Sequence, residues 1–88
     1  MHAVIVNVSI DDREEAAREL REDVIPRVSQ APGFVSGVWV AVAEGKGQAV
    51  ISFESEEAAR AVADIVRNAD RSAVTIDDIQ VCEVVASA

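Results

Sequence analysis

The chain has 88 residues, of which 50% are apolar, and its formal net charge is −8 at pH 7. A chain of this length forms one domain, residues 1–88, which buries only about 60–65% of its unfolded surface, so association is a favoured source of further burial. The acidic balance excludes nucleic acid and anionic membranes as partners, because both require basic patches.

The start of the chain and its single cysteine indicate the cellular compartment. The apolar run in MHAVIVNVSIDD is short, lacks a basic leader and continues into acidic residues, so it predicts neither a signal peptide nor a membrane span. Cys82 alone cannot form an intramolecular disulfide. We therefore expect a cytoplasmic protein. The acidic pairs at 11–12 and 77–78 have no histidine or cysteine nearby, and we expect neither a metal nor a cofactor.

Residues 3–10, AVIVNVSI, predict a strand because apolar β-branched side chains alternate along them. One face of this strand is wholly apolar. The mixed face carries Ile5, Asn7 and Ser9. A helix follows, with Asp11 as its N-cap. Its apolar stripe is Ala17, Leu20, Val24 and Val28. Pro26 predicts a kink or a tightened last turn before APG at 31–33 ends the helix.

Residues 34–43 and 47–54 predict the two strands of a β-hairpin. A type II′ loop at Gly45–Lys46, which places glycine first, fixes a register. The apolar pairs expected on one face are Val38 with Phe53, Val40 with Ile51, and Val42 with Ala49. Trp39 then lies opposite Ser52 on the mixed face of the sheet, and a slip by one residue would mix the two sets.

Ser55 is expected to cap a second helix. The apolar stripe of this helix is Ala59, Val62, Ala63 and Val66. Residues 68–78 are expected to form a loop, and the last strand is predicted at residues 79–86, IQVCEVVA. Because burial of Glu83 beneath the helices would be costly, this side chain is expected to face away from them. The residues expected to face the helices are Cys82 and Val84, and those on the other side are Val81, Glu83 and Val85.

The element order β-α-β-β-α-β predicts the α+β class and a ferredoxin-like fold. Right-handed crossovers place both helices on one face of a four-stranded antiparallel sheet. The opposite face is half apolar and has no cover in the monomer, and leaving it in water would forfeit several kcal/mol at about 25 cal/mol per Å². We therefore predict a homodimer that pairs the two open sheet faces by two-fold symmetry.

The six-element order, the helix exit APGFVSG and the passage ISFESEEAARAV resemble the antibiotic-biosynthesis-monooxygenase-like group of the dimeric α/β-barrel superfamily. The resemblance covers nearly the whole chain and rests on fold markers. It implies a homodimer whose sheets form a barrel-like interface, and an apolar pocket between sheet and helices. In enzymatic members this pocket binds a polycyclic, quinol-like or haem substrate.

Asn7 matches an asparagine on the first strand of the haem-degrading relatives. Those relatives also have a tryptophan near the end of the third strand, where this chain has Phe53 or Glu54. They have a histidine on the second helix, which this chain lacks. The resemblance therefore disfavours haem degradation, and for Asn7 a hydrogen bond at the interface is favoured over a ligand contact.

The candidate residues for a ligand or interface face are Asn7, Ser9, Trp39, Ser52 and Glu83. Trp39 is either an anchor of the dimer interface or one wall of a ligand site, and the first interpretation is favoured because tryptophan is enriched at interface hot spots. Glu83 is a candidate general base, but a solvated charge at the rim is favoured. No catalytic set is identified.

Two functions agree with these features. The first is a cofactor-independent, monooxygenase-like enzyme that acts on a small apolar or aromatic substrate in a dry pocket. The polar groups at hand for it are Asn7, Ser9, Ser52 and Glu83. The second is a non-catalytic dimeric module that takes part in a stress response or binds a small apolar ligand. The chain has no tyrosine and a single histidine, His2, so its acid–base groups are few and its status as an enzyme is left open.

Overall fold

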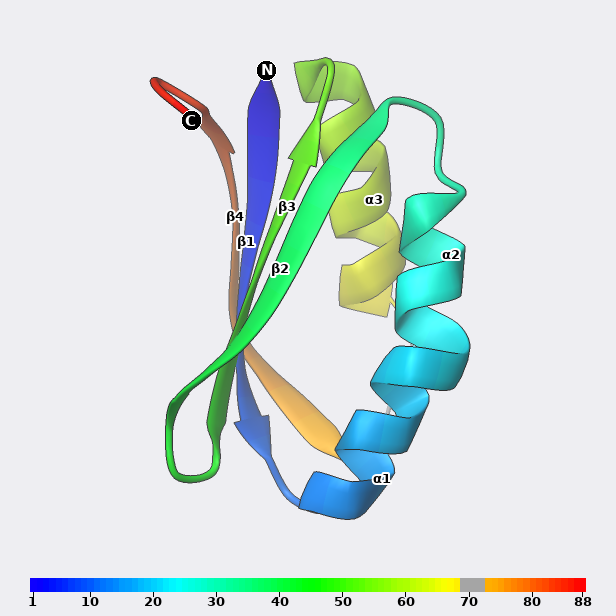
Figure 1. Ribbon diagram of the computed structural model, residues 1–88, viewed down its shortest axis with the longest axis vertical. Helices are drawn as coiled ribbons and strands as arrows, with labels where there is room; N and C mark the ends of the chain where they lie inside the picture. The colour runs from blue at the N-terminus through cyan, green and yellow to red at the C-terminus, as the bar shows by residue number, and fades with distance from the viewer. Residues whose placement is uncertain (69–72) are drawn as a thin grey trace.

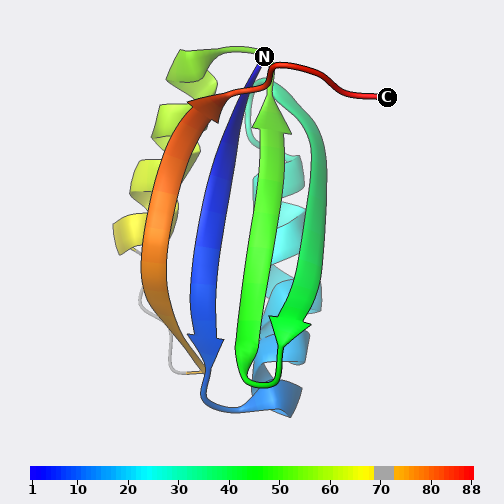
Figure 2. The same cartoon turned by 90° about the vertical axis from the view of Figure 1, so that its left-hand side faces the viewer.

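The computed structural model describes residues 1–68 and 73–88. A four-stranded antiparallel sheet forms one layer, and helices form a second layer against one face of it (Figure 1). The strands are β1 (His2–Ile10), β2 (Phe34–Ala43), β3 (Lys46–Phe53) and β4 (Val74–Glu83), in the spatial order β2-β3-β1-β4. Figure 2 shows the opposite face of the sheet, which none of the described helices covers. The predicted ferredoxin-like βαββαβ fold is confirmed.

The first helical stretch is divided where its hydrogen bonding changes. It consists of α1 (Arg13–Glu19), a π-helical segment η1 (Leu20–Val24) and α2 (Ile25–Ser29). The amide of Ile25 donates to the carbonyl of Leu20, which is the spacing of a π-helix. Pro26 has no amide hydrogen and lies in the first turn of α2. Of the two expected alternatives, a kink or a tightened last turn, the structure shows an irregularity in the form of a widened turn before the proline. At the end of the helix, the amide of Ala31 donates to the carbonyl of Val28, three residues back, at 3.1 Å.

Side-chain caps fix where the helices begin. Asp12, and not the predicted Asp11, caps α1: its Oδ1 accepts a hydrogen bond of 3.1 Å from a first-turn amide. Ser55 caps α3 (Glu56–Asn68) as predicted, because its Oγ accepts a hydrogen bond of 3.2 Å from the amide of Ala58. Within residues 1–68 and 73–88, no helix has the length and apolar character needed to cross a membrane.

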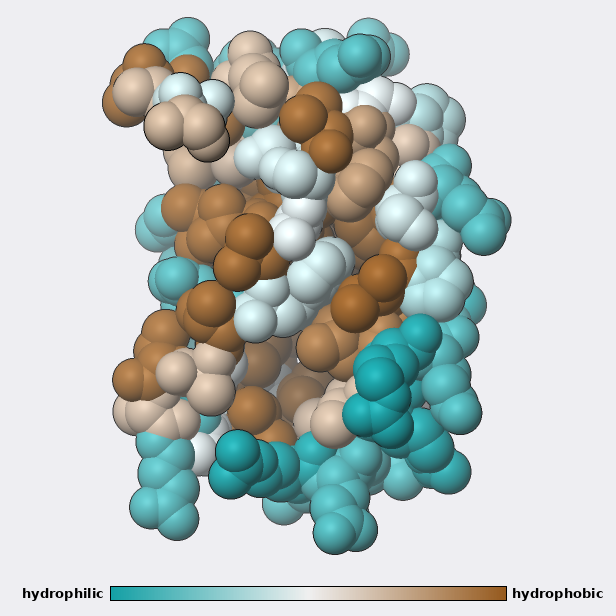
Figure 3. All heavy atoms as spheres, viewed as in Figure 1, coloured by the Kyte–Doolittle hydropathy of each residue, from teal (hydrophilic) through white to brown (hydrophobic). Residues whose placement is uncertain are grey.

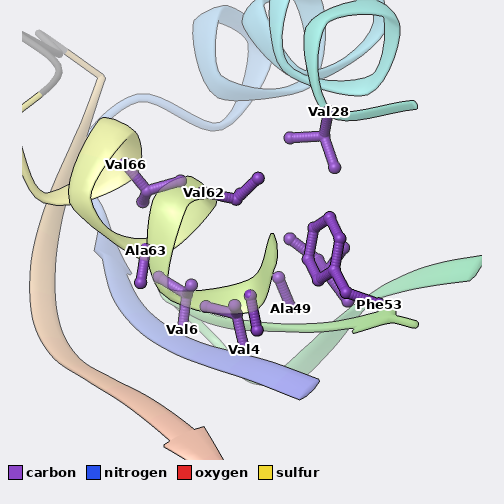
Figure 4. Close-up of a cluster of buried hydrophobic side chains, with 10 residues drawn as sticks. Val4, Val6, Val28, Ala49, Phe53, Val62, Ala63 and Val66 are labelled. Carbon is purple, nitrogen blue, oxygen red and sulfur yellow. The ribbon is translucent and has the colours of Figure 1, made fainter. Parts of the chain in front are cut away.

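The core lies between α3, α2 and the central strands, where the side chains of both layers point toward one another (Figure 4). The predicted stripe of α3 is buried in full: Ala59, Val62, Ala63 and Val66. Val4 and Val6 of β1 and Ile51 and Phe53 of β3 meet it from the sheet. Phe53 is fully buried and meets the ring of Phe34 edge-on, with 6.2 Å between the ring centroids.

The hairpin register differs from the predicted one. Ala49 lies opposite Trp39, where Val42 was expected. The two-residue loop is Glu44–Gly45, with glycine second at φ 72°, so the predicted Gly45–Lys46 loop is wrong. Because this displacement is odd, the side chains of β2 between its two irregularities, residues 36–41, turn to the other face of the sheet. Trp39 therefore faces the helices, and the prediction that it lies on the open face is wrong.

The last strand also differs from its prediction. β4 begins at Val74, so residues 74–78 are strand and not loop, while residues 69–72 of the predicted loop lie outside the described residues. Val81 lies opposite Val4 and packs against the core, and Cys82 lies opposite Ala3 on the open side. The prediction that Cys82 faces the helices is therefore wrong.

Glu83 lies opposite His2, which places it by alternation on the helix side of the sheet and not on the predicted open side. The sequence predicts that Glu83 avoids the cost of burying a carboxylate by facing away from the helices, but the structure avoids this cost in another way. Glu83 is the last residue of β4, and it is exposed there.

We expect Ile51→Val to lower the free energy of unfolding by about 0.5–1.5 kcal/mol, because it removes a buried methylene group from the core. Ile51 is 2% exposed, whereas Ile65 on the outer side of α3 is 51% exposed. Ile65→Val is the matched control, with an expected change within about 0.5 kcal/mol. Urea unfolding measures both, and equal effects of the two substitutions would contradict the placement of the core.

Candidate ligand-binding site

A cavity of about 290 Å³ lies between the sheet and the α1–η1 segment. Figure 3 shows a hollow between the sheet side and the helix side of the molecule, with hydrophobic side chains in its depth and hydrophilic ones along its lower and helical border. The sheet contributes side chains from all of its strands to the wall. We call this hollow the α1 cavity.

β1 and β3 form the floor of the α1 cavity. The β1 residues in the floor are Val6, Val8 and Ile10, the apolar face that the sequence predicts for this strand. Gly47 of β3 lies beside them and is buried. A β-carbon at Gly47 would lie 3.2 Å from Cγ2 of Val8 and 3.4 Å from Cδ1 of Ile10. The absence of a side chain at Gly47 therefore keeps the floor deep.

Trp39 forms the wall of the cavity on β2. Its indole lies over Gly37, because a β-carbon at Gly37 would come within 2.7 Å of the Cη2 atom of the ring. Trp39 is partly buried and lines the cavity, while Gly37 lets the ring lie along the strand. This placement favours the interpretation of Trp39 as a ligand wall over that of an interface anchor.

The helical wall is open because its side chains are small. No residue of α1 or η1 is buried, although the predicted stripe faces the sheet. The apolar residues of this wall are Ala16, Ala17, Leu20 and Val24. Two alanines at the start of the stripe leave space that larger side chains would fill. The cavity is therefore a consequence of the sequence of α1.

The structure places the predicted site residues at different positions on the sheet. Asn7 and Ser9 lie on the open face, with their side chains satisfied by hydrogen bonds. Oδ1 of Asn7 accepts a hydrogen bond of 3.0 Å from Nε2 of Gln48. The Oγ of Ser9 donates to Asp77 at 2.7 Å and accepts from Nζ of Lys46 at 2.6 Å.

Ser52 lies opposite Ala3 on the same face as Asn7 and Ser9. Trp39 lies on the other face, and Glu83 lies at the exposed end of β4. The five residues therefore do not form one site. Their assigned roles in ligand binding or in an interface stay predictions.

Arg13 and Glu19 are the ionisable residues among the described residues that line the cavity, and sequence reasoning missed both. Arg13 is the first residue of α1, and Ala16 and Ala17 follow it by three and four residues. That spacing places Arg13 on the same stripe of the helix as the cavity wall. The signal was present in the sequence, since the stripe extends backward from Ala17 to Arg13.

The groups with a shifted pKa lie on the outer surfaces of the helices. Hydrogen bonds from Arg60, together with its positive charge, lower the pKa of the Glu56 carboxyl. A hydrogen bond to Glu15 raises the pKa of Arg18. None of these four residues lines the α1 cavity. The shifts therefore mark exposed ion pairs and not a catalytic centre.

The open face is more apolar than predicted, because the corrected register places valines of β2 on it. Val38 is 57% exposed and Val40 is 42% exposed. Val38 lies opposite Val50 of β3, which in turn lies opposite Ile5 of β1. We call these four residues the open-face patch. It runs across β2, β3 and β1, the strands at the right and centre of Figure 2.

No family model matches the sequence, and no curated protein matches it. Solved structures match it over almost its whole length. HapK from Hahella chejuensis has a TM-score of 0.65 at 15% identity, with 100% of this chain and 96% of HapK covered. A dimeric ferredoxin-like protein from an uncultured marine organism has a TM-score of 0.64 at 16% identity, with coverages of 99% and 97%.

The haem degrader MhuD from Mycobacterium tuberculosis has a TM-score of 0.54 at 23% identity, with 97% of this chain and 98% of MhuD covered. The chain shares the ferredoxin-like fold of these solved structures. Identities this low show the shared fold alone. The ferredoxin-like fold assigns no activity to this chain, because one fold serves many functions.

The structure of MhuD holds two haems in its active site. Haem iron is ligated by histidine, cysteine, methionine or tyrosine. This chain has no tyrosine, and its single histidine, cysteine and methionine are His2, Cys82 and Met1. None of these three lines the cavity. The cavity therefore does not fit a haem that is ligated through its iron.

We expect Gly37→Val to displace the indole of Trp39, because the new side chain would occupy the position of the ring. The emission maximum of Trp39 should shift to longer wavelength, and the free energy of unfolding should fall by about 1–3 kcal/mol. Ser36→Val is the matched control, since Ser36 lies opposite Ser52 on the open side. Unchanged emission in Gly37→Val would show that the ring does not lie over Gly37.

Proposed function

We propose that the chain binds a small apolar or aromatic molecule in the α1 cavity. The observation that carries this proposal is the cavity of about 290 Å³ itself, whose walls are apolar on the sheet and on the helix. Ligand sites in proteins have volumes of roughly 300–1,000 Å³ and are mostly apolar, with a few polar groups. The α1 cavity lies at the small end of this range, which suits a ligand of about one or two fused rings.

Trp39 favours an aromatic ligand. Its indole offers a flat apolar surface along β2, with the partly buried ring supported by the backbone at Gly37. Aromatic rings gain about 0.5–1.5 kcal/mol from stacked or edge-to-face pairing beyond the burial of their area. A flat ligand between this ring and the helical wall would also remove the exposed side of Leu20 and Val24 from water.

The lining favours binding over catalysis. Arginine does not act as a base in proteins, because its guanidinium stays protonated there. That leaves Glu19 as the candidate base among the described residues that line the cavity. We therefore place ligand binding first, and monooxygenase-like oxidation of the bound molecule second. The apolar walls of the cavity support the second role, since exclusion of water from an active site prevents side reactions of reactive intermediates.

We further propose that two copies of the chain pair through the open-face patch. The exposed valines of β2 and their neighbours form a continuous apolar surface across three strands. Contiguous apolar surface of this kind marks an interaction site, and a two-fold axis lets one patch cover its own copy. The similar protein from the marine organism is described as dimeric. The Lys46–Asp77 ion pair lies at one end of the same face and would frame the contact.

Ala17→Leu should weaken binding in the cavity by at least about tenfold, because an overpacked wall costs about 1–3 kcal/mol. The probe is naphthalene-2-carboxamide, a neutral aromatic compound. The chain contains a single tryptophan, so one indole N–H cross-peak in a ¹⁵N correlation spectrum reports the cavity. Titration of the wild type should shift this cross-peak to saturation.

Ala61→Leu is the control for Ala17→Leu, since Ala61 is exposed on the outer side of α3. It should bind the probe as the wild type does. A wild-type cross-peak that does not move, or equal affinities of the wild type and Ala17→Leu, would contradict binding in the α1 cavity.

Val38→Glu should weaken the dimer by at least about tenfold, because the two-fold axis places the new carboxylate in both copies of the patch. Ile65→Glu adds the same charge on α3, away from the open face, and should leave the dimer intact. Sedimentation velocity over a range of protein concentrations measures both. A wild-type chain that sediments as a monomer at every concentration would contradict the dimer.

A further inference from the structure

The cations of this chain are mostly neutralised by nearby carboxylates. The ion pairs are Arg18–Glu15, Arg27–Asp23, Lys46–Asp77, Arg60–Glu56 and Arg67–Asp64. Among the arginine and lysine side chains of residues 1–68 and 73–88, Arg13 and Arg21 have no such ion pair. Of these two, Arg13 lines the α1 cavity and Arg21 does not. Arg13 is thus an uncompensated guanidinium at an apolar cavity.

The position of Arg13 in the helix explains why it has no ion pair within the part of the chain that the structure describes. Each paired arginine follows an acidic residue by three or four positions on the same helix. Arg13 is the first residue of α1, so no helical turn precedes it. The residues that follow it by three and four positions are Ala16 and Ala17, which form the cavity wall. The helix therefore offers the guanidinium apolar neighbours and no carboxylate.

We infer that the ligand of the α1 cavity is an anion, an aromatic or apolar body with one carboxylate that Arg13 binds. This inference rests on the proposed binding function. The planar guanidinium matches a carboxylate with two parallel hydrogen bonds, and such charged hydrogen bonds are the strong ones. The apolar walls and Trp39 take the body of the ligand. Arg13 is then the residue that sets the charge of the ligand.

Glu19 is the other charged residue of the lining. It favours a cationic ligand less than Arg13 favours an anionic one. Its charge acts on the neighbouring Arg18 and helps to raise the pKa of that guanidinium, so it already has a cation beside it. The net charge of −8 repels anions at a distance. At physiological ionic strength, however, exposed charges are screened beyond about 8 Å. The charged group in contact with the ligand therefore determines which ligand charge is preferred.

The test compares naphthalene-2-carboxylate with its neutral isostere naphthalene-2-carboxamide, with the indole cross-peak of Trp39 as the readout. The wild type should bind the carboxylate at least about tenfold more tightly than the amide. Arg13→Gln should bind the two equally, through loss of affinity for the carboxylate alone. Arg21→Gln removes the same charge from an exposed site outside the cavity and should keep the wild-type preference.

Equal binding of the two probes by the wild type would overturn the inference and leave binding in the cavity intact. A preference that survives in Arg13→Gln would assign it to another group and would also overturn the inference. Loss of the preference for the carboxylate in Arg21→Gln would show that the preference comes from the overall charge and not from Arg13. This result would also overturn the inference. A cross-peak that neither probe moves would overturn both this inference and the proposed function.

Discussion

The pairing of Trp39 with Ala49 across β2 and β3 decides what each face of the sheet presents. Side chains alternate along a strand, so this one pairing turns Trp39 toward the helices and Val38 and Val40 toward the open side. A register displaced by one residue would exchange the two sets. The cavity would then lose its aromatic wall, and the open face would carry a large ring in place of a flat row of valines.

The helical layer is packed at one end and hollow at the other. At the packed end, Val62 of α3 and Val28 of α2 lie with Phe53 in the buried cluster. At the hollow end, Ala16 and Ala17 take the corresponding places. The packed end holds the helices against the sheet, so the alanines can leave space without loss of the fold. Stability and binding are in this way assigned to different residues of the same layer.

Helices and strands were predictable from the sequence where only one interpretation of the residue pattern was possible. The helix α3 has a clear period in its buried stripe and a serine cap, and the bounds of β2 agree with the predicted residues 34–43. The register of β2 was not predictable from its pattern, because both of its faces are apolar. Val38 and Val40 on one side and Trp39 and Ala41 on the other are equally suited to burial. Only the loop distinguishes the registers, and glycine fits either loop position.

β4 was misread for a different reason. Asp77 and Asp78 interrupt its apolar pattern and indicate a loop, yet the structure accommodates them at an irregularity where Asn7 pairs with Asp78 and Val8 with Ile76. The extra residue between Ile76 and Ile79 is the trace of this bulge in the sequence. The candidate site was also ambiguous in the sequence. From the sequence alone, Arg13 cannot be distinguished from the other surface arginines, because only the structure shows that its helical neighbours line a cavity.

The two proposed surfaces are opposite sides of one strand. Val38 and Val40 flank Trp39 in the chain and point away from it, so a partner on the open face would restrain the backbone from which the indole extends. β2 is an edge strand, with a neighbour on one side only, and edge strands are held less firmly than central ones. A dimer would hold β2 against β3 and keep the Trp39 wall in place. Association through the open face and binding in the α1 cavity would therefore favour the same conformation of β2, and each would stabilise the state that the other requires.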